Sequence, residues 1–208
     1  MNKNRTALIR MTASALLAAL VFLFGMTPLG LIPLGFVNIT VLCIPVIIGA
    51  VLLGVRAGLI LGFCFGTAST LSMIGLSLTP PSGLASALFA AAPLEAVIMC
   101  YVPRLLVPLV ASAVYYAMTA IKARNSASVA LAATLGSLSN TVFYLGLMLL
   151  FYALNGLDTQ NILRLIAGTG LIAGGCEAVA AALIAVPVVH ALEKTPLGAS
   201  LRRNGGKR

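Results

Sequence analysis

Charged residues are scarce in this chain of 208 residues: they make up 8% of it, and only four are acidic. Hydrophobic residues make up 61%, and the mean hydropathy is +1.11. A water-soluble domain of this size needs a largely polar surface, which such a composition cannot supply. The scarcity of charge therefore excludes an ordinary soluble domain.

Motifs for catalysis and metal binding are missing as well. The chain has a single histidine, His190, and no His-Glu-x-x-His, Gly-x-Ser-x-Gly, paired-aspartate or Walker pattern. Its four cysteines lie singly in apolar stretches and never form Cys-x-x-Cys, so we interpret them as small core side chains. We expect no enzyme activity, no metal and no cofactor, and an ATP-driven role would require a separate ATPase.

Aromatic residues are also few, at 6%, although the formal net charge is +9. A nucleic-acid-binding surface would combine the cations with aromatic side chains on one solvated face. Here the cations lie at the ends of apolar segments instead. They are better explained as topology signals and contacts to anionic lipid headgroups, so we expect a lipid bilayer and no nucleic acid as a partner.

Long apolar stretches are what the chain does have. A membrane-spanning helix needs about 20 apolar residues, and polar or Gly/Pro-rich breaks delimit several such stretches. The expected helices cover residues 7–25, 37–53, 57–76, 127–153 and 162–190. The first resembles a signal peptide, but no small-residue cleavage site follows it, so we expect it to be retained.

The stretch 84–121 is too long for one crossing, since a single helix of that length would run about 57 Å. It must form two pieces, and the positive-inside rule decides whether both cross. Six crossings with the N-terminus inside leave eleven of the thirteen cations cytoplasmic, with Arg104 and Arg164 outside. Seven crossings would leave six inside and seven outside.

Six crossings are therefore predicted. The fold class is an all-α membrane protein with six transmembrane helices, both termini cytoplasmic, one domain over residues 1–192 and a basic cytoplasmic tail over 193–208. In this arrangement 84–100 lies on the outer side as a re-entrant helix or a loop, and Arg104 begins the fourth helix near its outer end. An arginine there either extends to lipid headgroups or meets an anionic partner.

Polar side chains inside the predicted helices are the candidate functional residues, because each costs free energy in lipid unless it is paired or hydrated. Glu177 and Asn140 both lie about 20 Å from the loop at 155–161, counted at 1.5 Å per residue. They either form a structural contact between helices or share a cavity. Asn38 and Thr40 follow the Gly/Pro-rich loop 26–36, which is either a lid over a pocket or a plain turn.

Four stretches in this order resemble the substrate-binding S components of energy-coupling factor (ECF) vitamin transporters, closest to the pantothenate-specific branch. They are "IPLGFVNITVLCIPVIIGAVLLGVRAGLILGFCFGTAS" (32–69), "YVPRLLVPLVASAVYY" (101–116), "LGSLSNTVFYLG" (135–146) and "EAVAAALIAVPVVHAL" (177–192). The resemblance covers most of residues 7–192. It implies a subunit that binds a vitamin from outside and works with a transmembrane coupling subunit and two cytoplasmic ATPases in a bacterial plasma membrane.

The resemblance also implies roles for particular residues. Substrate contacts would come from Asn38, Thr40, Arg104, Asn140 and Glu177, with the planar fork of Arg104 suited to a carboxylate. Pantothenate, a small hydroxylated amide with one carboxylate, fits this chemistry. The small residues Ala15 and Ala19 on the first helix would dock onto the coupling subunit.

Two alternatives stay open at this point. The substrate could be another water-soluble vitamin or precursor, such as a pyridoxine-like or hydroxymethylpyrimidine compound. The chain could also be a non-transporting membrane scaffold, in which Arg104 extends to lipid and Glu177 only packs.

Overall fold

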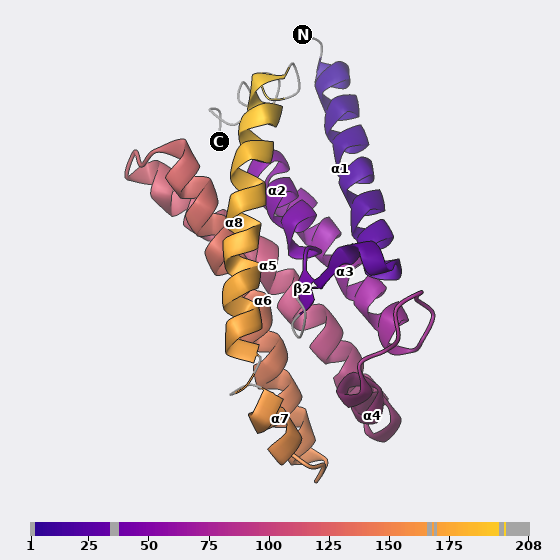
Figure 1. The fold of residues 1–208 in the computed structure, drawn as a ribbon. Helices are drawn as coiled ribbons and strands as arrows, with labels where there is room; N and C mark the ends of the chain where they lie inside the picture. The colour runs from indigo at the N-terminus through magenta and orange to yellow at the C-terminus, as the bar shows by residue number, and fades with distance from the viewer. Residues whose placement is uncertain (1–2, 34–37, 166–167, 169, 196–197, 199–208) are drawn as a thin grey trace.

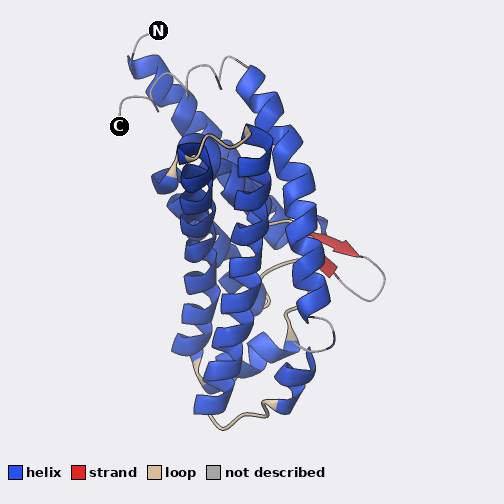
Figure 2. Cartoon of the chain, turned by 90° about the vertical axis from the view of Figure 1, so that its left-hand side faces the viewer, coloured by secondary structure: helices blue, strands red, loops and turns tan. Residues whose placement is uncertain are grey.

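A computed structural model of the chain describes residues 3–33, 38–165, 168, 170–195 and 198. Long helices run side by side along one axis, and a small hairpin lies on one flank (Figures 1 and 2). The helices are α1 (Lys3–Met26), α2 (Cys43–Leu53), α3 (Val55–Met73), α4 (Gly83–Ala91), α5 (Pro93–Ala120), α6 (Asn125–Leu154), α7 (Gln160–Leu165) and α8 (Leu171–Lys194). A 3-10 turn, η1 (Pro28–Gly30), and the strands β1 (Leu31–Pro33) and β2 (Asn38–Thr40) complete the described elements.

Helix α2 is the centre of the bundle. Its sequence, "CIPVIIGAVLL", is apolar on every side, and all of its residues except Leu52 are buried. A helix that is hydrophobic all round must be surrounded by protein or lipid. Here α1, α3, α5, α6 and α8 all pack against it. The core around α2 includes Ile47, Leu61 and Val107.

A second apolar cluster lies toward the opposite end of the long helices. It joins α4, α5, α6 and α7 through fully buried side chains that include Leu88, Met99, Met148 and Ile162. The hydroxyl of Tyr152 on α6 donates a hydrogen bond to the carbonyl of Leu84 on α4 at 2.6 Å. The described residues thus form two apolar cores, one toward each end of the bundle.

The prediction of a helix over 37–53 is wrong for the first part of that segment. Residues 38–40 form the strand β2, which pairs antiparallel with β1 in the register Leu31↔Thr40, Ile32↔Ile39 and Pro33↔Asn38. Helix α2 begins only at Cys43 and has 11 residues, about 17 Å at 1.5 Å per residue. Apart from this hairpin, the described fold is helical, as expected.

The division of 84–121 into two pieces is confirmed, but its position is not. The break falls at Ala92, and α5 runs from Pro93 to Ala120 with Pro103 and Pro108 inside it. Arg104 therefore does not begin the helix. It lies eleven residues after Pro93 (104 − 93 = 11), about 17 Å along α5.

Five described helices are long and apolar enough to cross a bilayer: α1, α3, α5, α6 and α8. The short apolar α2 would have to be the sixth, so the count of six crossings stays a prediction. The region expected as one helix over 162–190 comprises α7 and α8, with 166–167 and 169 between them outside the described residues. The turn at Gly54 and the loop expected over 77–83 are both present.

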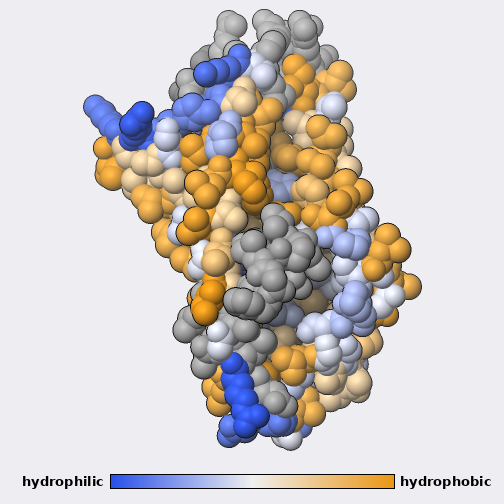
Figure 3. Space-filling view, in the orientation of Figure 1, coloured by the Kyte–Doolittle hydropathy of each residue, from blue (hydrophilic) through white to orange (hydrophobic). Residues whose placement is uncertain are grey.

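Polar contacts gather at the end of the bundle where α1 begins and α8 ends (Figure 1). The Arg10 guanidinium donates to the carbonyl of Leu53, the last residue of α2. Asn125 donates to a carboxylate oxygen of Glu193 at 2.8 Å and accepts from the Tyr115 hydroxyl at 3.2 Å. In Figure 3 the upper half of the molecule, below the polar residues at the top, is largely hydrophobic, as expected for contact with lipid tails.

Candidate functional site

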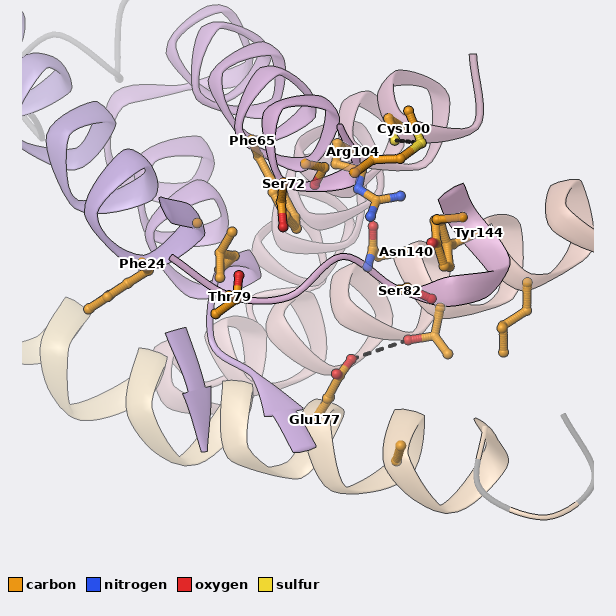
Figure 4. Close-up of a pocket in the computed structure, with 18 of the residues that line it drawn as sticks. Phe24, Phe65, Ser72, Thr79, Ser82, Cys100, Arg104, Asn140, Tyr144 and Glu177 are labelled. Atoms are coloured by element: carbon orange, nitrogen blue, oxygen red, sulfur yellow. Dashed lines mark hydrogen bonds between the residues drawn. The ribbon is translucent and has the colours of Figure 1, made fainter. Parts of the chain in front are cut away.

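A cavity of about 540 Å³ lies between the two apolar cores. Its walls come from α1, α3, α4, α5, α6 and α8, and the segment after Met73 closes one side. The polar groups in the wall include three predicted site residues, Arg104, Asn140 and Glu177 (Figure 4). The alternative of a shared cavity for Asn140 and Glu177 is therefore the one that the geometry supports.

Arg104 is buried, with 8% of its surface exposed. Its guanidinium carbon lies 4.4 Å from the ring centroid of Tyr144 and 5.3 Å from that of Phe65. One terminal nitrogen, Nη1, donates to the carbonyl of Met99 at 3.2 Å, and the buried Nε has no hydrogen-bond partner. Among the described residues, no acidic side chain forms an ion pair with Arg104.

The depth of Arg104 bears on the lipid alternative. A side chain reaches headgroups by extending from a helix position near the membrane surface. Arg104 is instead about 17 Å along α5, enclosed by two aromatic rings and facing the cavity. Its charge is therefore available to a molecule in the cavity and not to lipid.

Asn140 and Glu177 approach the cavity from two other helices. Glu177 on α8 has 9% of its surface exposed and accepts a hydrogen bond from Thr141 on α6 at 3.4 Å. The Asn140 side chain points toward Arg104 in Figure 4, and its buried Oδ1 has no hydrogen-bond partner. Arg104 and Glu177 thus enter from different walls, so the described lining of the cavity has one basic and one acidic group.

Hydroxyl groups line the side formed by α3 and the loop after it. Ser69 and Ser72 face the cavity, whereas Thr67 and Thr70 bond back to carbonyls of their own helix at 3.0 and 2.9 Å. This division agrees with the usual tendency of helical hydroxyls to satisfy themselves locally. Ser77 bonds to Ser72 at 3.0 Å and thereby holds the loop against α3.

The other two predicted substrate contacts are in the hairpin. Asn38 and Thr40 belong to β2, and their side chains lie outside the described residues. The chain leaving β2 reaches the cavity at Leu42, while Thr27 reaches it from the start of the 26–36 loop. Whether that loop acts as a lid stays a prediction.

Sequence reasoning missed the aromatic walls. Tyr144 follows Asn140 by four residues and so shares its helix face, while Phe65, Ser69 and Ser72 recur at helical spacing on α3. This helical spacing was the signal in the sequence that could have placed the aromatic side chains in the cavity wall. The two predicted docking residues, Ala15 and Ala19, are exposed on α1.

The fold is shared with a solved structure. The described structure resembles the crystal structure of the S-component for biotin from an ECF-type ABC transporter, with a TM-score of 0.59 and 18% identity. The match covers 97% of this chain and all of the other. At that identity, the likeness shows a shared fold.

Residues 9–189 match the family of ECF transporter substrate-specific components, and the chain belongs to this family. It is therefore a substrate-binding subunit of a membrane transporter and not an enzyme. No curated protein sequence matches the chain. Family membership also removes the alternative of a non-transporting scaffold.

Proposed function

We propose that this S component captures a small, water-soluble vitamin carrying one carboxylate, with pantothenate as the first candidate. The observation that carries the proposal is the buried Arg104, which faces the cavity and has no ion-pair partner among the described residues. A buried charge costs several kcal/mol unless it is compensated. The two aromatic rings and the Met99 carbonyl compensate part of this cost, and a ligand carboxylate would supply the rest.

The remaining walls suit the rest of such a ligand. The cavity volume of about 540 Å³ falls within the usual range of about 300–1,000 Å³ for small-molecule sites. Glu177 can accept hydrogen bonds from ligand hydroxyl groups, and Asn140 can both donate and accept. Pantothenate offers hydroxyl groups, an amide and a carboxylate, which matches these partners.

Biotin is the second candidate, because the S-component of similar fold is described as specific for biotin. It too carries one carboxylate, and its ring N–H groups could donate to Glu177. Pyridoxine-like and hydroxymethylpyrimidine compounds lack a carboxylate and would leave the charge of Arg104 uncompensated. The site chemistry therefore favours an acid over these alternatives.

Transport follows from the family and the orientation. Cations concentrate where α1 begins and α8 ends, and the core around α2 separates the cavity from that end, so the positive-inside rule directs the cavity outward. The ligand would enter from outside a bacterial plasma membrane. Delivery would require a transmembrane coupling subunit and two cytoplasmic ATPases, since the sequence contains no Walker motif.

Calorimetric titration of the purified protein tests the proposal. We expect nanomolar binding of pantothenate and much weaker binding of pyridoxine and hydroxymethylpyrimidine, while tight biotin binding would select the second candidate.

Arg104→Ala should abolish binding of the acid ligand without lowering expression. Arg164→Ala, which removes an exposed arginine on α7, is the matched control and should bind like the parent. Equal affinity in Arg104→Ala and parent would contradict a carboxylate contact.

A further inference from the structure

Arg104 lies directly after a proline, and this neighbour has a specific effect on the helix. In an α-helix the N–H of residue i bonds to the carbonyl of residue i−4. Residue 103 would thus bond to Met99, but Pro103 has no N–H and its ring crowds that carbonyl. The Met99 carbonyl is left without its helical donor in a fully buried position.

The guanidinium of Arg104 takes the place of the missing donor. Its Nη1 donates to the Met99 carbonyl at 3.2 Å, five residues back along the same helix. A buried carbonyl without a partner and a buried guanidinium with unused donors would each cost free energy. Pro103 leaves the Met99 carbonyl without its helical donor, and the side chain of Arg104 donates to this carbonyl in its place.

Pro108 acts on the backbone of the same residue. It lies four residues after Arg104 and removes the N–H that would bond to the Arg104 carbonyl. Gly62 on α3 lies against this carbonyl: a Cβ added there would be 2.7 Å from the oxygen. The main chain at Arg104 is therefore held by packing against α3, while the side chain is held by Met99, Phe65 and Tyr144.

We propose that Pro103 is a positioning residue for substrate binding: it frees the Met99 carbonyl to hold one side of the Arg104 guanidinium, so that the other side faces the cavity. This inference rests on the proposed function, in which Arg104 binds a carboxylate. An arginine side chain has many rotamers, and fixing it before the ligand arrives removes part of the entropy cost of binding. Pro103 thereby contributes to selection of acids over neutral analogues.

A purely structural role for Pro103 makes a different prediction. If the proline only bends α5, its replacement would affect acidic and neutral ligands alike. If it positions Arg104, the loss is confined to acids. Pantothenate and pantothenol, in which an alcohol replaces the carboxylate, separate the two roles.

The first experiment compares Pro103→Ala with the parent by calorimetry. The alanine restores an N–H to residue 103, which competes with Arg104 for the Met99 carbonyl. We expect pantothenate affinity to fall about tenfold, a change of about 1.4 kcal/mol, and pantothenol affinity to change less than twofold. Pro108→Ala, at the other buried proline of α5, is the matched control and should lower the two affinities by similar factors. Equal losses for both ligands in Pro103→Ala, or no loss for either, would overturn the proposal.

A ligand-free measurement decides the matter if the substrate is a different one. The thermal midpoint of Pro103→Ala is compared with that of the parent, and the same substitution is made in an Arg104→Met background. Only the parent background has a buried cation that loses its acceptor. We expect Pro103→Ala to change the thermal midpoint less favourably in the parent background than in the Arg104→Met background, by about 2–4 °C. Identical changes in the two backgrounds would refute the proposal that Pro103 acts through Arg104. Pro103→Ser restores the same N–H and repeats the test if the alanine variant does not fold.

Failure of the proposed function is distinguishable from failure of this inference. If Arg104→Ala binds pantothenate like the parent, the proposed carboxylate contact is wrong, regardless of the result for Pro103→Ala. If Arg104→Ala abolishes binding but Pro103→Ala does not weaken it, the contact stands and the positioning role is wrong.

Discussion

Arg104 and Glu177 give the cavity its chemical polarity at the scale of single residues. One lies on α5 between two aromatic rings, and the other lies on α8 beside Thr141. Both are buried, so a ligand that reaches them exchanges its hydration for fixed protein groups. In this setting a charge-assisted hydrogen bond contributes more than it would at the surface.

The role of Glu177 can be tested by removing its charge alone. Glu177→Gln keeps the shape of the side chain but replaces a carboxylate acceptor with a neutral amide. Because hydrogen bonds to charged groups contribute about 1.5–3 kcal/mol, we expect pantothenate affinity to fall at least tenfold in calorimetric titration. Glu95→Gln is the control, since Glu95 bonds to Asn155 and does not line the cavity. Affinity within twofold of the parent in Glu177→Gln would exclude a direct contact.

At the scale of elements, the approach of α3 to α5 places Arg104 at the cavity. Gly58, Gly62 and Gly66 recur every four residues on α3 and face α5. An added Cβ would lie 2.8 Å from Pro108 at the first, 2.7 Å from the Arg104 carbonyl at the second and 2.6 Å from the Tyr101 ring at the third. Small residues at this spacing let two helix backbones pack closely.

Gly62→Ala should therefore disturb the site from the opposite helix. The new methyl group meets backbone, which cannot rotate away, so α5 must shift. We expect a loss of about 1–3 kcal/mol in stability from overpacking, seen as a lower thermal midpoint, together with weaker ligand binding. Gly146→Ala on α6 is the matched control, because nothing lies within 4 Å of the added Cβ. An unchanged midpoint and affinity in Gly62→Ala would show that the contact is looser than the structure indicates.

The sequence predicted some elements well and others poorly, for physical reasons that differ. Counting from the loop at 155–161 placed Asn140 and Glu177 at one depth, because helical rise is nearly constant, and both line the cavity. The start of α5 was misplaced because helix length and the count of cations divide 84–121 without locating the break. The local signal is Pro93, which is at the first turn, where proline favours helix initiation.

The hairpin was missed because neither of its strands is marked off from its surroundings in the sequence. The strand β2 follows a Gly/Pro-rich loop and continues without a polar break into the apolar α2. An apolar run of this kind does not reveal by itself where strand ends and helix begins. Its partner β1 lies only a few residues earlier, within the stretch 26–36 that we interpreted as a Gly/Pro-rich loop.

At the scale of the whole molecule, the cavity lies between two apolar cores that hold different sets of helices together. The core around α2 packs α1, α2, α3, α5, α6 and α8 into one unit. The cavity lies between this unit and the smaller core of α4, α5, α6 and α7. The identity of the transport system comes from family membership, since the described residues of the cavity wall do not specify a coupling partner.

We propose that a coupling partner contacts the exposed face of α1. Ala15 and Ala19 are exposed beside the large exposed side chains of Met11 and Leu16, while Ala18 packs against the core around α2. A stripe of small residues between larger ones permits close approach of another helix. Ala15→Trp combined with Ala19→Trp would fill this stripe without touching the cavity.

We expect the double tryptophan variant to bind ligand within twofold of the parent, because α1 contributes only its far end, near Phe24 and Gly25, to the cavity. Uptake of radiolabelled pantothenate into cells that also express an ECF module should be lost, because the bulky rings prevent docking. Leu183→Trp, at an exposed position on α8, controls for the effect of a tryptophan at the lipid-facing surface and should leave uptake intact. Normal uptake in the double variant would mean that the coupling subunit contacts a different face of the bundle.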